Sequence, residues 1–166
     1  MRFSKLIFIL FVKQNLQPVN NSTGSLSLHE NSSQGYSIQY NKSNWNVEDN
    51  GAAGYGEPST SFQNKQYPND IAVTVSINPW NGGDFQNFAE SVSGMMTLLG
   101  VKVTEINQAQ KYLSASGFNT NYNKMNIGRM YYSPGRSMAV DIIYSSSMEG
   151  SQQLKEAVAM IKSAIF

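Results

Sequence analysis

The chain has 166 residues, 40% of them hydrophobic and 11% aromatic, which is enough to bury one core of ordinary size and favours a single folded domain. Only 14% of the residues are charged and the formal net charge is +1, so there is no broad basic field to hold nucleic acid. The sequence contains no cysteine, which excludes disulfides, thiolate metal sites, cysteine nucleophiles and lipid attachment through a cysteine.

The first 13 residues have the order of an export signal. Arg2 and Lys5 precede an apolar run at 6–12, and this run ends at Lys13. A membrane-spanning helix needs about 20 apolar residues, so the run is too short to span. No small-x-small cleavage pattern follows directly, and the alternative is an apolar strand or helix of the core. We expect residues 1–13 to be a signal-like or membrane-anchoring segment, and the protein to be extracytoplasmic, either secreted or membrane-tethered.

Residues 14–34 are rich in Asn, Ser and Gln and have too few apolar side chains to offset the entropy of ordering them. We therefore expect a flexible linker. Asn20, Asn21, Asn31 and Asn41 each begin an Asn-x-Ser/Thr sequon, a glycosylation acceptor in an exported eukaryotic or archaeal protein. The only histidine, His29, also falls in this segment, and we interpret it as a solvated side chain.

From residue 35 to residue 166 the pattern is that of one folded domain. Alternation of apolar and polar residues predicts strands at 36–40, 45–48, 71–78 and 101–106, and more loosely at 118–125. The strand at 71–78 is the clearest, because its odd-numbered residues are all β-branched and share one face.

Two amphipathic helices are expected, near 84–99 and 150–164. Asp84 is a good N-cap for the first helix, and Gly100 is its stop signal. The second begins at Ser151 or Glu149. Each helix carries an apolar stripe, which requires a sheet to cover it.

A hairpin precedes the second helix, with strands at 126–132 and 137–145 joined by a type I or II turn at Pro134 and Gly135. We expect it to supply the middle of the sheet. Asp141 points away from the apolar face of its strand, so under a covering helix it would need a partner such as Arg129 or Arg136. The order of strands and helices predicts an α+β protein with a mainly antiparallel sheet.

Several of these segments together resemble the PsbP-like family, over about residues 35–166. They are the opening 35–40 followed by Trp45, the strand at 71–78, the helix at 84–99, the segment around Gly117 and Phe118, the hairpin with Tyr131 and Tyr132, and the terminal helix. The family includes the extrinsic PsbP protein of photosystem II, the Mog proteins, which bind a small nuclear GTPase, and many exported prokaryotic proteins. Members usually have proline where this chain has Asn41 and Lys42. The resemblance implies an α/β/α sandwich and a non-enzymatic binding or assembly role, but it assigns no functional residue to a position in this chain.

The residues themselves show no catalytic or metal-binding set. A Ser–His–Asp triad or a His-ligated metal requires a histidine fixed in the fold, and His29 is assigned to the linker. The carboxylates lack EF-hand spacing, and the Gly-rich segment 51–56 lacks the Lys-Ser/Thr of a phosphate-binding loop. We expect no enzyme, no cofactor and no metal.

Aromatic residues near strand ends are the candidates for a partner interface, because Tyr and Trp are favoured contact residues. Trp80 is the first candidate, and Tyr131 and Tyr132 follow; a plug over the apolar stripe of the helix is the other role open to Trp80. We expect an exported binding or assembly domain that contacts a protein partner, such as a membrane complex, and that does not bind nucleic acid. The alternative is a small-molecule or cation carrier with a pocket near Trp80 and Asp84.

Overall fold

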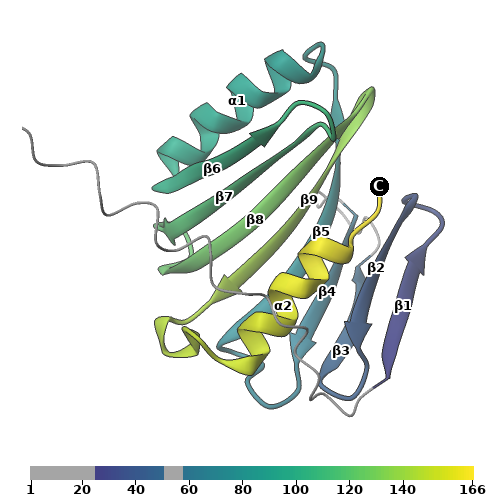
Figure 1. Ribbon diagram of the computed structural model, residues 1–166, viewed down its shortest axis with the longest axis vertical. Helices are drawn as coiled ribbons and strands as arrows, with labels where there is room; N and C mark the ends of the chain where they lie inside the picture. The colour runs from purple at the N-terminus through teal and green to yellow at the C-terminus, as the bar shows by residue number, and fades with distance from the viewer. Residues whose placement is uncertain (1–24, 51–57) are drawn as a thin grey trace, which may run out of the picture.

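The computed structural model describes residues 25–50 and 58–166 (Figure 1). The signal-like segment 1–13, residues 14–24 of the expected linker, and the Gly-rich segment 51–56 lie outside the described residues. In chain order the elements are β1 Leu26–Asn31, β2 Tyr36–Asn41, β3 Trp45–Asn50, β4 Ser59–Asn64, β5 Ile71–Trp80, α1 Phe85–Leu98, β6 Val101–Asn107, β7 Tyr112–Asn119, β8 Lys124–Ser133, β9 Gly135–Tyr144, a single 3-10 turn at Ser146–Met148, and α2 Gln152–Ser163. No helix within these described ranges is long and apolar enough to cross a membrane.

Seven strands form the main sheet in the order β3-β4-β5-β9-β8-β7-β6, with every neighbouring pair antiparallel. The β8–β9 hairpin lies in the middle of this sheet, which confirms the expectation. Gly135 has φ +82°, as the third position of a type II turn requires. The expected strand at 118–125 is wrong, because a turn with Asn123 at φ 51° separates β7 from β8 there.

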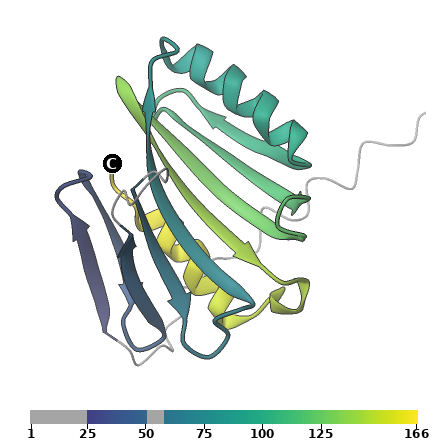
Figure 2. The same cartoon turned by 180° about the vertical axis from the view of Figure 1, so that it is seen from behind.

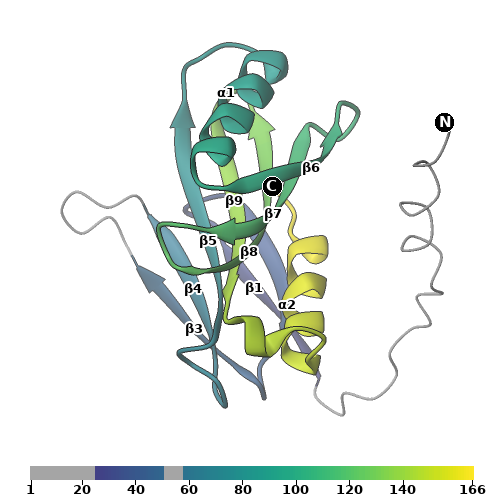
Figure 3. The same ribbon diagram turned by 90° about the vertical axis from the view of Figure 1, so that its left-hand side faces the viewer.

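The two helices lie on opposite faces of the sheet (Figure 3), so the expected α/β/α arrangement is confirmed. α2 covers the face formed by the apolar side chains of β5 and β9, together with the β1–β2 hairpin. α1 covers the other face, mainly over β6 and also over β7 and β8. The fully buried side chains of the α2 side include Trp45, Phe62, Val73, Val140 and Ile142.

Both helices begin as their sequences predict. The Asp84 carboxylate accepts a hydrogen bond from the Asn87 amide at 3.1 Å, and the Ser151 hydroxyl accepts one from the Leu154 amide at 3.1 Å. Ser151 rather than Glu149 is therefore the second cap. Gly100 follows α1 with φ +77°, a conformation that favours glycine.

Residues 26–31 do not belong to a linker, and on this point the sequence-based expectation is wrong. They form β1, which pairs antiparallel with β2 along its whole length. The far edge of β2 is closed by the C-terminal segment, since Ser37 and Ile165 exchange backbone hydrogen bonds of 3.0 and 2.9 Å. β1 is thus held by main-chain pairing more than by apolar burial.

Several described strands end in an asparagine whose side-chain oxygen accepts a hydrogen bond from a backbone amide of the following turn, as turn-forming asparagines do. These residues are Asn31, Asn41, Asn64, Asn107 and Asn119. Two of them are the sequon residues Asn31 and Asn41, which are only 9% and 5% exposed. In the folded protein these two amides are committed to turns, whereas Asn20 and Asn21 lie outside the described residues.

Candidate docking face

Beyond β8 the face that carries α1 has no helix over it in the part of the chain that the structure describes (Figure 2). In this view β5 runs in front of α2, and α1 lies beside β6, at one edge of the sheet. Between positions 59–61 of β4, 72–76 of β5 and 141–143 of β9, the residues that point to this side are all partly exposed, while Val73, Val75 and Val140, which point to α2, are fully buried. We name this surface the open face; it consists of Ser59, Ser61, Ala72, Thr74, Ser76, Asp141 and Ile143.

The open face is mainly polar because of the residues that alternate along its strands. On β4 and β5 every second residue is small and mostly hydroxyl-bearing, with Ser61 opposite Thr74 and Ser59 opposite Ser76. Such side chains supply hydrogen-bond donors and acceptors along neighbouring strands. Asp141, the only carboxylate among these seven residues, lies on β9.

The backbone of β8 lets the Asp141 side chain lie low against the sheet. Its cross-strand partners are Thr74 on β5 and Gly128 on β8. A Cβ at Gly128 would come within 2.4 Å of Asp141 Oδ1, so only glycine leaves room for the carboxylate in this position. Asn126 Nδ2 donates to Asp141 Oδ1 at 3.4 Å and to the Ile142 carbonyl at 3.2 Å.

Asp141 has no cationic partner among the described residues, where the only ion pair joins His29 to Asp49. Desolvation by burial raises the pKa of Asp141 to about 6, and the weak hydrogen bond from Asn126 opposes this only in part. A charge that is removed from water without a counter-charge is costly. The open face therefore carries an uncompensated acidic group on β9, at its border with β8.

The expectation that Arg129 or Arg136 would pair with Asp141 is wrong. Arg129 points to the opposite face of β8, where its guanidinium lies 4.2 Å from the centre of the Tyr112 ring and Nε donates to Ser114 Oγ at 3.3 Å. Arg136 lies at the hairpin turn and donates to the Gln34 carbonyl at 3.1 Å. Alternation of side chains along β8 directs the Arg129 guanidinium away from Asp141, and alternation along β9 does the same for Arg136.

The three aromatic interface candidates do not form one surface. Trp80 packs edge-on against Phe88, with ring centres 5.3 Å apart, and its Nε1 donates to the Gly83 carbonyl at 3.0 Å. Tyr132 donates to the same carbonyl at 3.1 Å, but Tyr131 lies on the other face and donates to the Ile161 carbonyl at 3.1 Å. Trp80 thus packs over the start of α1, beside Phe88 and Tyr132. Asp84, which was expected beside a carrier pocket, caps the helix.

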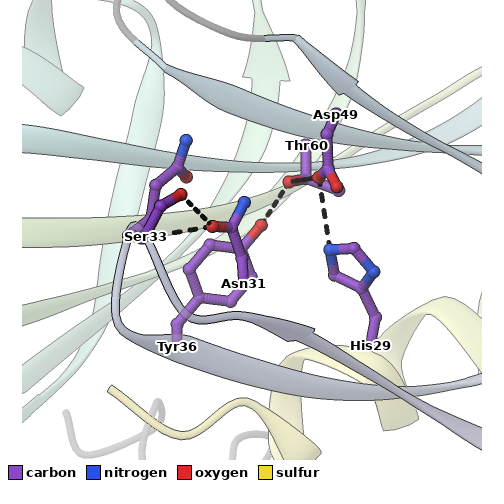
Figure 4. A network of polar contacts seen from close by, with 7 residues as sticks. His29, Asn31, Ser33, Tyr36, Asp49 and Thr60 are labelled. Atoms are coloured by element: carbon purple, nitrogen blue, oxygen red, sulfur yellow. Dashed lines mark hydrogen bonds and ion pairs between the residues drawn. The ribbon is translucent and has the colours of Figure 1, made fainter.

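A polar network that the sequence did not reveal joins the β1–β2 hairpin to β3 and β4 (Figure 4). Tyr36 donates its hydroxyl proton to Thr60 Oγ1, and Thr60 donates to Asp49 Oδ1. His29 Nε2 lies 3.2 Å from the same carboxylate oxygen, and the His29 side chain is only 15% exposed. This contact is short enough for an ion pair when the ring is protonated, although it is not a hydrogen bond. His29 is therefore not the solvated side chain that we expected.

This network is a structural connection between the two sheets. Burial raises the pKa of the Tyr36 hydroxyl, which keeps it a proton donor. No described serine forms a hydrogen bond to His29, as a nucleophile in a triad would, and no group of three potential metal ligands occurs among residues 25–50 and 58–166. The network depends on residues that become neighbours only through strand register, such as Asp49 and Thr60. The sequence alone could therefore not predict it.

Comparison with known proteins supports the fold. No family model matches the sequence, and no curated protein matches it. Among solved structures the chain is similar to the cyanobacterial PsbP protein CyanoP from Synechocystis sp. PCC 6803, with a TM-score of 0.57 and 12% identity over 88% of this chain and 95% of that one. A protein from Bacteroides thetaiotaomicron VPI-5482 is similar at a TM-score of 0.45 and 16% identity, over 78% of this chain and 44% of that one, which is too weak to argue from. The chain has a PsbP-like fold, as the resemblance of its sequence implied.

Proposed function

We propose that this chain is a non-enzymatic binding domain that works outside the cytoplasm and docks a protein partner on its open face, where a lysine or arginine of the partner pairs with Asp141. The observation that carries the proposal is a carboxylate without a counter-charge on a part of the sheet that no described helix covers. The PsbP-like fold and the signal-like start of the chain support an exported assembly role.

Charge complementarity defines the chemistry of the partner. A cation placed against Asp141 would compensate its negative charge. Docking would also exclude water from the site, and the attraction between two opposite charges is stronger when both are desolvated. Ser61, Thr74 and Ser76 would hydrogen-bond the polar groups around that cation. Small-molecule sites are lined mostly by apolar and aromatic side chains, so the hydroxyl-bearing open face suits a polar protein surface better.

Site-specific photo-crosslinking in the native host tests the proposal. A benzoylphenylalanine residue would replace Ser61 or Ser76 on the open face, and the matched control would carry it at Lys155, which is exposed on α2. We expect the two open-face positions to give the same crosslinked product, absent from the control, and Asp141→Asn to abolish it. A product that survives Asp141→Asn, or that forms equally from position 155, would contradict the proposal.

The compartment needs its own test. Mass spectrometry of the mature N-terminus in a membrane or secreted fraction should find the chain outside the cytoplasm. Recovery of an intact Met1 in a cytosolic fraction would remove the export part of the proposal without affecting the docking face.

A further inference from the structure

A second surface, far from the open face, is the free edge of β1. Figures 1 and 2 both show β1 as the outermost strand of the hairpin, with β2 on its inner side. Among the described residues β1 pairs only with β2. A strand edge of this kind presents unpaired backbone groups and is a template for another strand.

The contacts of β2 determine which β1 residues direct their backbone outward. Ser37 exchanges its backbone hydrogen bonds with Ile165, and Gln39 directs its amide to Ser163 Oγ at 2.9 Å, so both residues point away from β1. Their cross-strand partners, Glu30 and Leu28, are therefore in pairs that share no hydrogen bonds. It follows that Glu30, Leu28 and, by the same alternation, Leu26 direct their N–H and C=O groups to the free edge.

The side chains of these same residues are exposed. Leu26 and Leu28 are 69% and 53% exposed, and Glu30 is exposed as well, whereas Ser27, His29 and Asn31 point toward the main sheet. Natural edge strands are usually protected by lysine, proline or a bulge, and residues 26–31 contain none of these. The free edge thus combines unpaired backbone with two exposed leucines.

We propose that two copies of this chain associate by pairing β1 with β1 in antiparallel orientation, about a two-fold axis at Leu28. This register pairs Leu28 with Leu28 of the second copy and Leu26 with Glu30 of the second copy. Each of these pairs exchanges two backbone hydrogen bonds, and every outward-directed backbone group between Leu26 and Glu30 is satisfied. Any other antiparallel register leaves some of these groups unpaired.

Charge does not oppose a second copy as the occupant. The pairing sets each Glu30 against a leucine, and the two Glu30 residues lie about 14 Å apart along the strands, which is beyond the screening length of about 10 Å. The two Leu28 side chains meet across the axis on one face, where they cover each other. The isologous geometry that the strand allows is the one that closed dimers use.

Cysteine crosslinking tests both the contact and its register, because the chain has no cysteine of its own. Directly opposed residues in such a pair have Cα atoms about 5.5 Å apart, within the range that a disulfide spans. Leu28→Cys should form a disulfide dimer at least about tenfold faster than Leu98→Cys, a matched control at a leucine that is 85% exposed on α1. Leu26→Cys alone should not crosslink, but a mixture of Leu26→Cys and Glu30→Cys should.

Sedimentation of the cysteine-free protein gives an independent readout. Leu28→Pro removes only an outward N–H, so it should abolish the reversible dimer and keep the hairpin; circular dichroism and thermal unfolding would check the fold. Leu28→Lys, which keeps the backbone, should weaken the dimer, and Leu98→Lys should not. Equal crosslinking at positions 28 and 98, or a monomeric wild-type protein at every concentration, would overturn the proposal. Asp141→Asn should leave the dimer intact. The dimer proposal and the proposed docking of a partner at Asp141 can therefore fail independently of each other.

Discussion

Replacement of Asp141 by asparagine should remove one term of the pH dependence of stability. Burial raises the pKa of this carboxyl from 3.8 to about 6 in the folded protein. The folded state therefore holds the proton more tightly than the unfolded state, and its stability falls as the pH rises from about 4 through 6. A difference of about 2.2 pKa units corresponds to at most about 3 kcal/mol. Because the side chain keeps some contact with water, we expect about 1–2 kcal/mol.

Urea unfolding of the wild type and Asp141→Asn across this pH range measures the term, because contributions of all other groups cancel in the difference. The free energy of unfolding of the wild type should fall by about 1–2 kcal/mol relative to the variant, a midpoint shift of about 0.5–1 M. Ser76→Ala, on the same face and without a titratable group, should show a constant difference. A difference that does not change with pH for Asp141→Asn, or a wild type that gains stability relative to this variant as the pH rises, would refute the burial argument.

Three further outcomes follow from other contacts. Gly128→Ala should displace the Asp141 carboxylate, because the new Cβ would come within 2.4 Å of Oδ1, and should reduce the pH-dependent term in the same urea assay. Thr60→Val should cost about 1–3 kcal/mol, because it leaves the Tyr36 hydroxyl without its acceptor, while adding Tyr36→Phe should recover part of that loss in a double-mutant cycle. In a host that glycosylates exported proteins, mass spectrometry should find Asn31 and Asn41 unmodified in folded protein, and a glycan on either would show that its turn forms late.

Much of the fold could be predicted from local patterns in the sequence. Apolar residues at every second position predict the strand at 71–78, the capping residues predict the starts of both helices, and the Pro-Gly turn predicts the central hairpin. β1 could not be found in this way. Its inward side chains are Ser27, His29 and Asn31, while its leucines point outward, so its hydrophobic pattern is the reverse of the usual one. Its stability comes from pairing with β2 and from the network at Asp49, which are tertiary contacts.

The candidate docking face could be predicted only in part. Alternation along 137–145 correctly placed Asp141 away from the apolar face of its strand. Which residue lies beside Asp141 depends on strand register, and the sequence does not determine the register. A shift of one residue would move Arg129 to the face that carries Asp141. The structure pairs Gly128 with Asp141 instead, and this leaves the carboxylate without a cation.

The most direct test of the docking face is the affinity of the crosslinked partner, once purified, for the wild type and for Asp141→Asn at about pH 5 and pH 7.5. Loss of a partly buried charge pair should weaken binding at least about tenfold, or about 1.4 kcal/mol. We predict that the wild type binds more tightly at the higher pH, where Asp141 is ionised, and that the variant binds weakly at both. Equal affinities of the two proteins at pH 7.5 would contradict the account.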